Sequence, residues 1–264
     1  MDDAAPTTPD SFTVSVVVPV KDDAEPLARC LAALADQTRP ADEIIVVDNA
    51  SVDASADVAS AAGVTLLRCT EPGIPATSAR GYDAATGDLI LRLDADCLPT
   101  DTWIEHTVAA FAARPDVAAF TGGARFIDGP AALRAPLAAV YLCAYALALV
   151  PALGHLPLFG SHLAFRAAAW QRIRRRVHRH DDIHDDVDLA FHIGERHRIR
   201  YLPGITMGIS MRPFFDPAGL VVRVDRGFRS VIVHWPRDFP PLRWARLILV
   251  RTTGRMAPAA TAVR

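Results

Sequence analysis

VSVVVPVKDDAEPLARCLAALADQTRPADEIIVVDN, residues 14–49, is the stretch that decides the fold. It opens with a short β-branched run that stops at Lys-Asp-Asp, as expected for a parallel strand buried on both faces. Leu27, Leu31 and Leu34 then recur at helical spacing, and a second apolar run, IIVV, stops at Asp48-Asn49. The stretch therefore predicts a strand, a helix and a second strand in succession.

The same alternation continues toward the C-terminus. It predicts helices over residues 53–62, 74–86 and 103–112, and strands over 64–68, 88–93 and 117–126. This order indicates an α/β fold with a doubly wound, mostly parallel sheet and helices on both faces. Ligands bind such sheets beyond the carboxyl ends of the strands. The polar residues at those ends are Lys21, Asp22, Asp48, Asn49, Asp94 and Asp96.

Composition narrows the class of protein. The 264 residues are 51% hydrophobic, which is enough for a large core, and the net charge of -2 gives no basic field to attract nucleic acid. Four scattered cysteines without CxxC spacing, and no pattern typical of a secretory leader, predict a reduced, cytoplasmic setting.

An apolar stretch, LAAVYLCAYALALVPALGHLPLF, covers residues 137–159. Its length is close to the roughly 20 residues that a membrane-crossing helix needs. However, Pro151, Gly154 and Pro157 would leave backbone groups unpaired in lipid. We therefore expect a buried or interface-lying helix over residues 132–150 rather than a transmembrane span.

The strongest candidate site is LILRLDADCLP, residues 89–99, where an apolar strand ends in two carboxylates. Because side chains alternate along a strand, Asp94 and Asp96 point to the same side. Two oxygen donors there can hold Mg²⁺ or Mn²⁺, which usually completes its shell with water and substrate phosphates. The alternative is a plain acidic turn after a strand.

Five motifs in order resemble the family 2 glycosyltransferases, which have the GT-A fold, a Rossmann-like arrangement. The resemblance covers about residues 15–204. The motifs are VSVVVPVKDD (14–23), EIIVVDNASVD (43–53), SARGYDAATGDLILRLDADCLP (78–99), GSHLAFR (160–166) and HDDVDLAFHI (184–193).

The resemblance implies a donor and metal site at the strand ends. Asp96 would be the direct ligand of Mn²⁺ or Mg²⁺, and Asp94 would face both the ribose and the metal. A strand-end turn is the alternative role for Asp48, and an exposed helix position is the alternative for Arg80. The implied nucleotide-sugar-binding residues are Pro19, Val20, Lys21, Asp48, Arg80 and Asp94.

The resemblance also implies a catalytic helix at residues 184–193. Asp186 aligns with the base that deprotonates the acceptor hydroxyl, and Asp185 replaces the family's usual Glu. An inverting transfer needs one such base for a single in-line displacement. The alternative is simple stabilisation of a helix N-terminus by carboxylates.

The segment GSHLAFR resembles the acceptor side of the family's site. It would bring Gly160, Ser161 and His162 to the acceptor, and His184 would add a hydrogen bond. The alternatives are an ordinary strand start and an exposed loop histidine.

A histidine-rich run allows a competing hypothesis, because His and Asp together can form a zinc site. The spacing fits no compact ligand template, and RRRVHRH resembles a basic loop that faces a phosphate-bearing substrate. A separate metal site remains the alternative. The histidines of the run are His178, His180, His184, His192 and His197.

The C-terminal stretch PLRWARLILVRTTGRMAP, residues 241–258, surrounds apolar residues with arginines. A basic helix with a Trp at its edge suits an anionic membrane surface. A helix packed on the domain is the alternative, and both remain open. The arginines are Arg243, Arg246, Arg251 and Arg255.

The expected organisation is a disordered tail, one GT-A domain and a C-terminal segment. The tail covers residues 1–12, and the domain covers 13–235, with a nucleotide-binding half at 13–98 and an acceptor half at 99–235. A basic amphipathic segment occupies 236–264.

The predicted function is a metal-assisted, inverting transfer of one sugar from a nucleotide-sugar to a glycan, lipid-linked or small-molecule acceptor. The chain lacks the Gln-x-x-Arg-Trp motif of processive synthases. We expect a cytoplasmic protein. If the C-terminal segment binds a membrane, the protein would be peripheral on the inner face of that membrane. The alternatives are a polyprenyl-phosphate sugar synthase and an inactive nucleotide-sugar-binding module; VKDDAEP does not resemble the Gly-rich loop of a nucleotidyltransferase.

Overall fold

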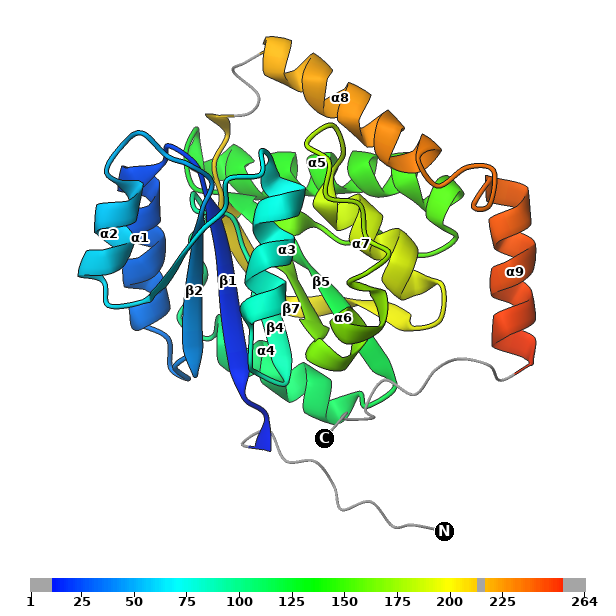
Figure 1. Cartoon of the computed structure of the whole chain (residues 1–264), viewed down its shortest axis with the longest axis horizontal. Coiled ribbons are helices and arrows are strands. Elements are labelled where there is room, and N and C mark those ends of the chain that lie inside the picture. The colour runs from blue at the N-terminus through cyan, green and yellow to red at the C-terminus, as the bar shows by residue number, and fades with distance from the viewer. Residues whose placement is uncertain (1–10, 213–216, 254–264) are drawn as a thin grey trace.

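The computed structural model describes residues 11–212 and 217–253, and within them it confirms the α/β prediction. Seven strands form one sheet in the order β3-β2-β1-β4-β6-β5-β7 (Figure 1). The strands are β1 (Val14–Val20), β2 (Glu43–Asp48), β3 (Thr65–Arg68), β4 (Leu89–Arg92), β5 (Val117–Phe126), β6 (Leu163–Arg166) and β7 (Arg198–Ile209).

The helices follow the predicted alternation, and their ends differ from the expected ones by a few residues. They are α1 (Ala24–Ala35), α2 (Ser55–Ala61), α3 (Ile74–Ala84), α4 (Trp103–Ala113), α5 (Ala131–Leu153), α6 (Ala167–Ile173), α7 (Asp185–Gly194), α8 (Pro217–Ile232) and α9 (Pro240–Thr252).

One strand runs against the others. β1 pairs in parallel with β2 and β4, and β5 pairs in parallel with β7. β6 lies between β4 and β5 and is antiparallel to both. The start of β6 therefore lies at the edge where β4 ends, and this places the GSH segment (Gly160–His162) beside the Asp94-Ala95-Asp96 turn.

The core has two halves, one on each face of the sheet. Val16 and Val18 belong to the half that includes α1 and α4, whereas Val17 belongs to the half that includes α3 and α7. Figure 1 shows α3 and α7 in front of the sheet and α1 and α2 at its left side. Burial on both faces explains why β1 has no polar alternation.

Helix α5 is more exposed than the sequence predicted. Only Ala138, Leu149, Ala152 and Leu153 of its 23 residues are buried. Among the described residues α5 is long and apolar enough to cross a membrane, by length and composition only. The expectation of a buried helix is therefore wrong for most of its length, and the interface-lying version remains.

The C-terminal helix α9 packs on the domain through one of its arginines. Arg243 is buried, donates to the Leu153 carbonyl at 2.7 Å and pairs with Asp238 at 2.8 Å. Its guanidinium also lies 4.6 Å from the centre of the Phe191 ring. Arg243 is thus unable to face a membrane; Arg251 is exposed, and Arg255 lies outside the described residues.

The predicted N-terminal tail of residues 1–12 includes a residue that packs on the folded domain. Phe12 packs against the core, and the Arg166 guanidinium lies 5.3 Å from the centre of its ring. The rest of the predicted tail, residues 1–10, lies outside the described residues.

Candidate active site

A cleft of about 1040 Å³ opens at the carboxyl ends of β1, β2 and β4. Asp94 and Asp96 line it from the loop after β4, and Asp186 lines it from the N-terminus of α7. Residues of α5 and α8 complete the wall. The two acidic clusters that the sequence singled out therefore share one space.

The carboxylates after β4 are held in place by different partners. Asp94 accepts a 2.6 Å hydrogen bond from the Ser161 hydroxyl and forms a 2.8 Å ion pair with Arg92. Asp96 forms a 2.9 Å ion pair with Arg212, which also binds Asp23 at 2.7 Å. Burial and then the charge of Asp94 raise the pKa of Asp96. A cation between the two carboxylates would relieve that repulsion.

Asp186 has the surroundings of a base whose position is fixed. Its Oδ2 accepts a 2.8 Å hydrogen bond from the backbone N–H of Gly160 and lies 3.1 Å from the Tyr145 hydroxyl. Burial, followed by the charge of the neighbouring Asp185, raises the pKa of Asp186. A raised pKa makes a carboxylate a stronger base.

Arg92 contacts both acidic clusters from the buried side of the cleft. It is 2% exposed, and its guanidinium lies 2.8 Å from Asp94 and 3.6 Å from Asp185. Burial lowers the pKa of Arg92, but these carboxylates raise it by more, so the side chain stays charged. Arg92 therefore positions both carboxylates while it is itself hidden from solvent.

Some of the predicted donor residues line the cleft and others do not. Pro19, Val20 and Lys21 line the cleft. Asp48 is buried, where its carboxylate accepts a hydrogen bond from the Ser51 N–H at 3.1 Å, and Arg80 is exposed on α3. Neither Asp48 nor Arg80 lines the cleft. Residues that line it beside the first group are Asn49, Gly73 and Thr77.

Only two of the four predicted acceptor residues line the cleft. Ser161 and His184 line the cleft. Gly160 contributes only its backbone N–H to Asp186, and an added Cβ would collide with Arg92. His162 is buried under β5, where its Nδ1 lies 2.8 Å from the Gly123 carbonyl.

Sequence reasoning missed several residues around the cleft. Arg92 was detectable, because a charged residue inside the apolar strand LILRL needs a buried partner. No local pattern marked Tyr145, which stands in an apolar helix, or Arg212, which reaches Asp96 from 116 residues away.

The fold and family are clear from comparison with known proteins. The model of Glycosyl transferase family 2 matches residues 15–178. Among solved structures, a mannosyltransferase from Pyrobaculum calidifontis in complex with GDP-Man and Mn²⁺ has a TM-score of 0.62 and 19% identity, over 99% of this chain and 79% of that chain. A glucosyl-3-phosphoglycerate synthase from Mycobacterium tuberculosis with Mn²⁺ and UDP has a TM-score of 0.56 and 18% identity, over 78% and 75% of the two chains.

A curated glycosyltransferase matches part of this chain. The glycosyltransferase AglE of Haloferax volcanii is 33% identical over 104 residues, which are 36% of this chain and 34% of that protein. The match thus spans about a third of the relative's length. With more than half of its residues matched by the family model, this chain belongs to Glycosyl transferase family 2.

Proposed function

We propose that this protein transfers one sugar from a nucleotide-diphosphate sugar to an acceptor hydroxyl with inversion. The observation that carries the proposal is the shared cleft, in which Asp96 and Asp186 line one space and Arg92 links their neighbours. A single base and one departing nucleotide fit an in-line displacement, which needs no second nucleophilic carboxylate.

The residues after β4 fit a divalent cation. Asp94 and Asp96 each offer an oxygen, and these atoms lie within 4.8 Å of one another. Hard oxygen donors suit Mn²⁺ or Mg²⁺. When bound, such an ion neutralises charge on the departing diphosphate. Arg212 contacts one oxygen of Asp96, Oδ2, at 2.9 Å.

The donor's nucleoside would lie against Pro19, Val20 and Lys21, with Asn49 and Thr77 beside it. The complexes of GDP-Man and UDP with similar structures support a nucleotide donor. Asp48 and Arg80 have no direct part in this proposal, because neither side chain lines the cleft.

Asp186 accepts the proton of the acceptor hydroxyl. The Gly160 N–H and the Tyr145 hydroxyl fix its Oδ2, and its raised pKa favours proton uptake. Ser161 and His184 lie on the same wall and can orient the acceptor.

The apolar residues of α5 and α8 that line the cleft favour a second candidate function, which is transfer of the sugar to a lipid phosphate. Tyr141 and Leu149 of α5 and Val224 and Phe228 of α8 line the cleft, and Phe228 is 64% exposed. An apolar wall suits a prenyl chain, and the exposed apolar side chains of α5 and α8 suit peripheral binding to the inner face of a membrane. Activity with a polyprenyl phosphate, and none with soluble sugars, would select this candidate.

The main proposal is tested with two variants and one control. Asp186→Asn should retain nucleotide-sugar binding, measured by calorimetry, and lose transfer by about 10³-fold, because the base is gone while the donor pocket is intact. Asp96→Ala should lose metal-dependent donor binding and turnover. Asp182→Asn, in the loop before α7 and 53% exposed, should behave as wild type. Wild-type turnover in both active-site variants would refute the proposal.

A further inference from the structure

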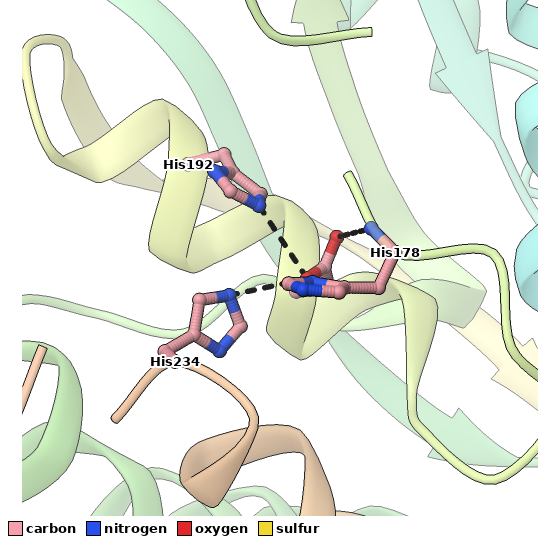
Figure 2. A group of neighbouring side chains, drawn as sticks. His178, His192 and His234 are labelled. Atoms are coloured by element: carbon pink, nitrogen blue, oxygen red, sulfur yellow. Dashed lines mark hydrogen bonds and ion pairs between the residues drawn. The ribbon is translucent and has the colours of Figure 1, made fainter. Parts of the chain in front are cut away.

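Three histidines and one aspartate meet outside the cleft. Asp188 and His192 are one helical turn apart on α7, His178 comes from the loop before α7, and His234 follows α8. Figure 2 shows the rings of His178, His192 and His234 converging on one carboxylate. One ligand atom from each of the four residues lies within 4.8 Å of the other three.

The distances are close to those of a tetrahedral site. Asp188 Oδ1 lies 2.7 Å from His178 Nδ1, 3.1 Å from His234 Nε2 and 3.5 Å from His192 Nε2. Zinc bonds of 2.0–2.1 Å in a tetrahedron separate neighbouring ligand atoms by about 3.3 Å. The three distances from the carboxylate oxygen bracket this value, and all four ligand atoms lie within 4.8 Å of one another.

The hydrogen bonds orient the free lone pairs inward. His234 Nδ1 lies 2.9 Å from the Ser230 carbonyl, which can only accept, so Nδ1 carries a proton, and in the neutral imidazole Nε2 then carries a lone pair. That lone pair faces a carboxylate oxygen, which also can only accept. Asp188 Oδ2 is already occupied by the His178 backbone N–H at 3.0 Å. A cation between these atoms would remove the conflict.

Burial strengthens the case for a cation. The side chains of His234 and His192 are 4% and 9% exposed, and the Nε2 atoms of both face Asp188 Oδ1 without making a hydrogen bond. The Phe191 ring stacks on His234 with ring centres 4.0 Å apart, which shields the cluster from water. Buried polar atoms without partners are costly.

We propose that His178, Asp188, His192 and His234 bind a structural Zn²⁺ ion. Three imidazoles and one carboxylate are donors that zinc prefers, and four protein ligands leave no open position for catalysis. The hydrogen bond from His234 Nδ1 to a carbonyl is the kind of outer contact that fixes a zinc-bound imidazole. The site is chemically distinct from the all-oxygen pair Asp94 and Asp96.

The ion would join three segments that form the acceptor side of the cleft. It connects α7, which begins with Asp185 and Asp186, to the preceding loop and to the end of α8. His184 already contacts α8 at two points: its N–H donates to the Ser230 hydroxyl at 2.7 Å, and its Nε2 lies 2.9 Å from the Arg223 carbonyl. Zinc would thus fix α8 against the base-bearing helix.

The test is zinc binding by the full chain, purified without a polyhistidine tag and stripped with a chelator. Titration with ZnCl₂ should show one tight equivalent in wild type and in Asp96→Ala, which lacks the cleft metal site. His178→Ala and His234→Ala should each weaken this binding by at least about tenfold, because one of four ligands is lost. His180→Ala, an exposed histidine of the same loop, should bind as wild type.

A spectroscopic readout separates zinc binding from the folding of the variants. Co²⁺ added to stripped Asp96→Ala should give the intense visible absorption of a tetrahedral ion, and ZnCl₂ should abolish it. The absence of a tight zinc equivalent in wild type, an octahedral Co²⁺ spectrum, or undiminished binding by both His178→Ala and His234→Ala would overturn the proposal. Because the readout is binding, it is independent of transferase activity.

Discussion

Arg92 is the residue on which the two acidic clusters depend. Its side chain is fully buried beneath Asp94 and Asp185, so each charge compensates the other in a region with little water. Removing one member of a buried ion pair leaves the rest uncompensated, which costs far more than losing an exposed pair. This difference makes the role of Arg92 measurable.

Arg92→Met should lower the free energy of unfolding by up to about 3–5 kcal/mol, because two partly buried carboxylates lose their buried cation. Urea denaturation followed by circular dichroism measures the change. The control is Arg29→Met, which breaks the exposed i,i+4 pair with Glu25 and should cost no more than about 0.5 kcal/mol. Equal costs for the two variants would show that Arg92 has no such role.

His162 gives the fold a sensitivity to acid. Burial lowers its pKa from 6.5 to about 4. Between these values the unfolded chain binds a proton that the folded chain does not, so stability falls as the pH drops from about 6.5 toward 4. The shift corresponds to about 3 kcal/mol at the acid end of this window.

His162→Gln removes the titrating group and keeps a donor for the Gly123 carbonyl. The unfolding free energy of this variant should fall less than that of wild type between pH 6.5 and 4. His180→Gln, at an exposed position, should follow the wild-type curve. If all three curves are parallel, His162 is not the source of the acid sensitivity.

At the scale of elements, α5 presents an unusual surface. Its Val140 and Leu147 are 66% and 76% exposed, although the helix is the most apolar stretch of the chain. A soluble partner or a membrane would remove these side chains from water. Peripheral membrane binding is part of the second candidate function. The arginines of α9 do not support it, because Arg243 is buried.

The double variant Val140→Asp/Leu147→Asp should weaken binding to vesicles at least tenfold, since each side chain contributes about 1.5–3 kcal/mol on full insertion. Co-sedimentation with vesicles that contain anionic lipid measures it. Val52→Asp, at a position 93% exposed in the loop before α2, is the matched control. Failure of the wild-type protein to bind any vesicles would rule out the membrane version.

Elements with strong local signals were predicted well. β1 and β5 have the predicted ends, and α1 contains the helically spaced Leu27, Leu31 and Leu34. Their apolar runs are either continuous or helically spaced, so periodicity alone identifies them. The burial of α5 was predicted poorly, because apolar composition shows what a helix could bury and not what covers it.

At the scale of the whole molecule, donor binding should stabilise the fold. A nucleotide-sugar at 100 times its Kd adds about 2.7 kcal/mol to the unfolding free energy, which for a domain of this size corresponds to a Tm increase of several degrees. A thermal-shift screen of UDP-, GDP- and dTDP-sugars should show this increase with Mn²⁺ and a smaller one without it. Asp96→Ala should lose the difference.

Site residues at the ends of strands and the start of a helix could be predicted from the sequence. Contacts between side chains of elements that are far apart in the sequence could not. Asp94, Asp96 and Asp186 lie in one cleft because the ends of β4 and the start of α7 meet there. The contact between Arg212 and Asp96 depends on long-range folding that no spacing reveals. The grouping of the histidine cluster escaped prediction for the same reason, because His234 lies 42 residues after His192.

The reversed strand β6 has a consequence for how such enzymes can diversify. Because it runs against β4, the loop that precedes it reaches the same rim as the loops that follow the parallel strands. Phe159 and Ser161, just before β6, line the cleft, so under the proposed function their exchange should change the acceptor preference while the parallel strands keep their sequence.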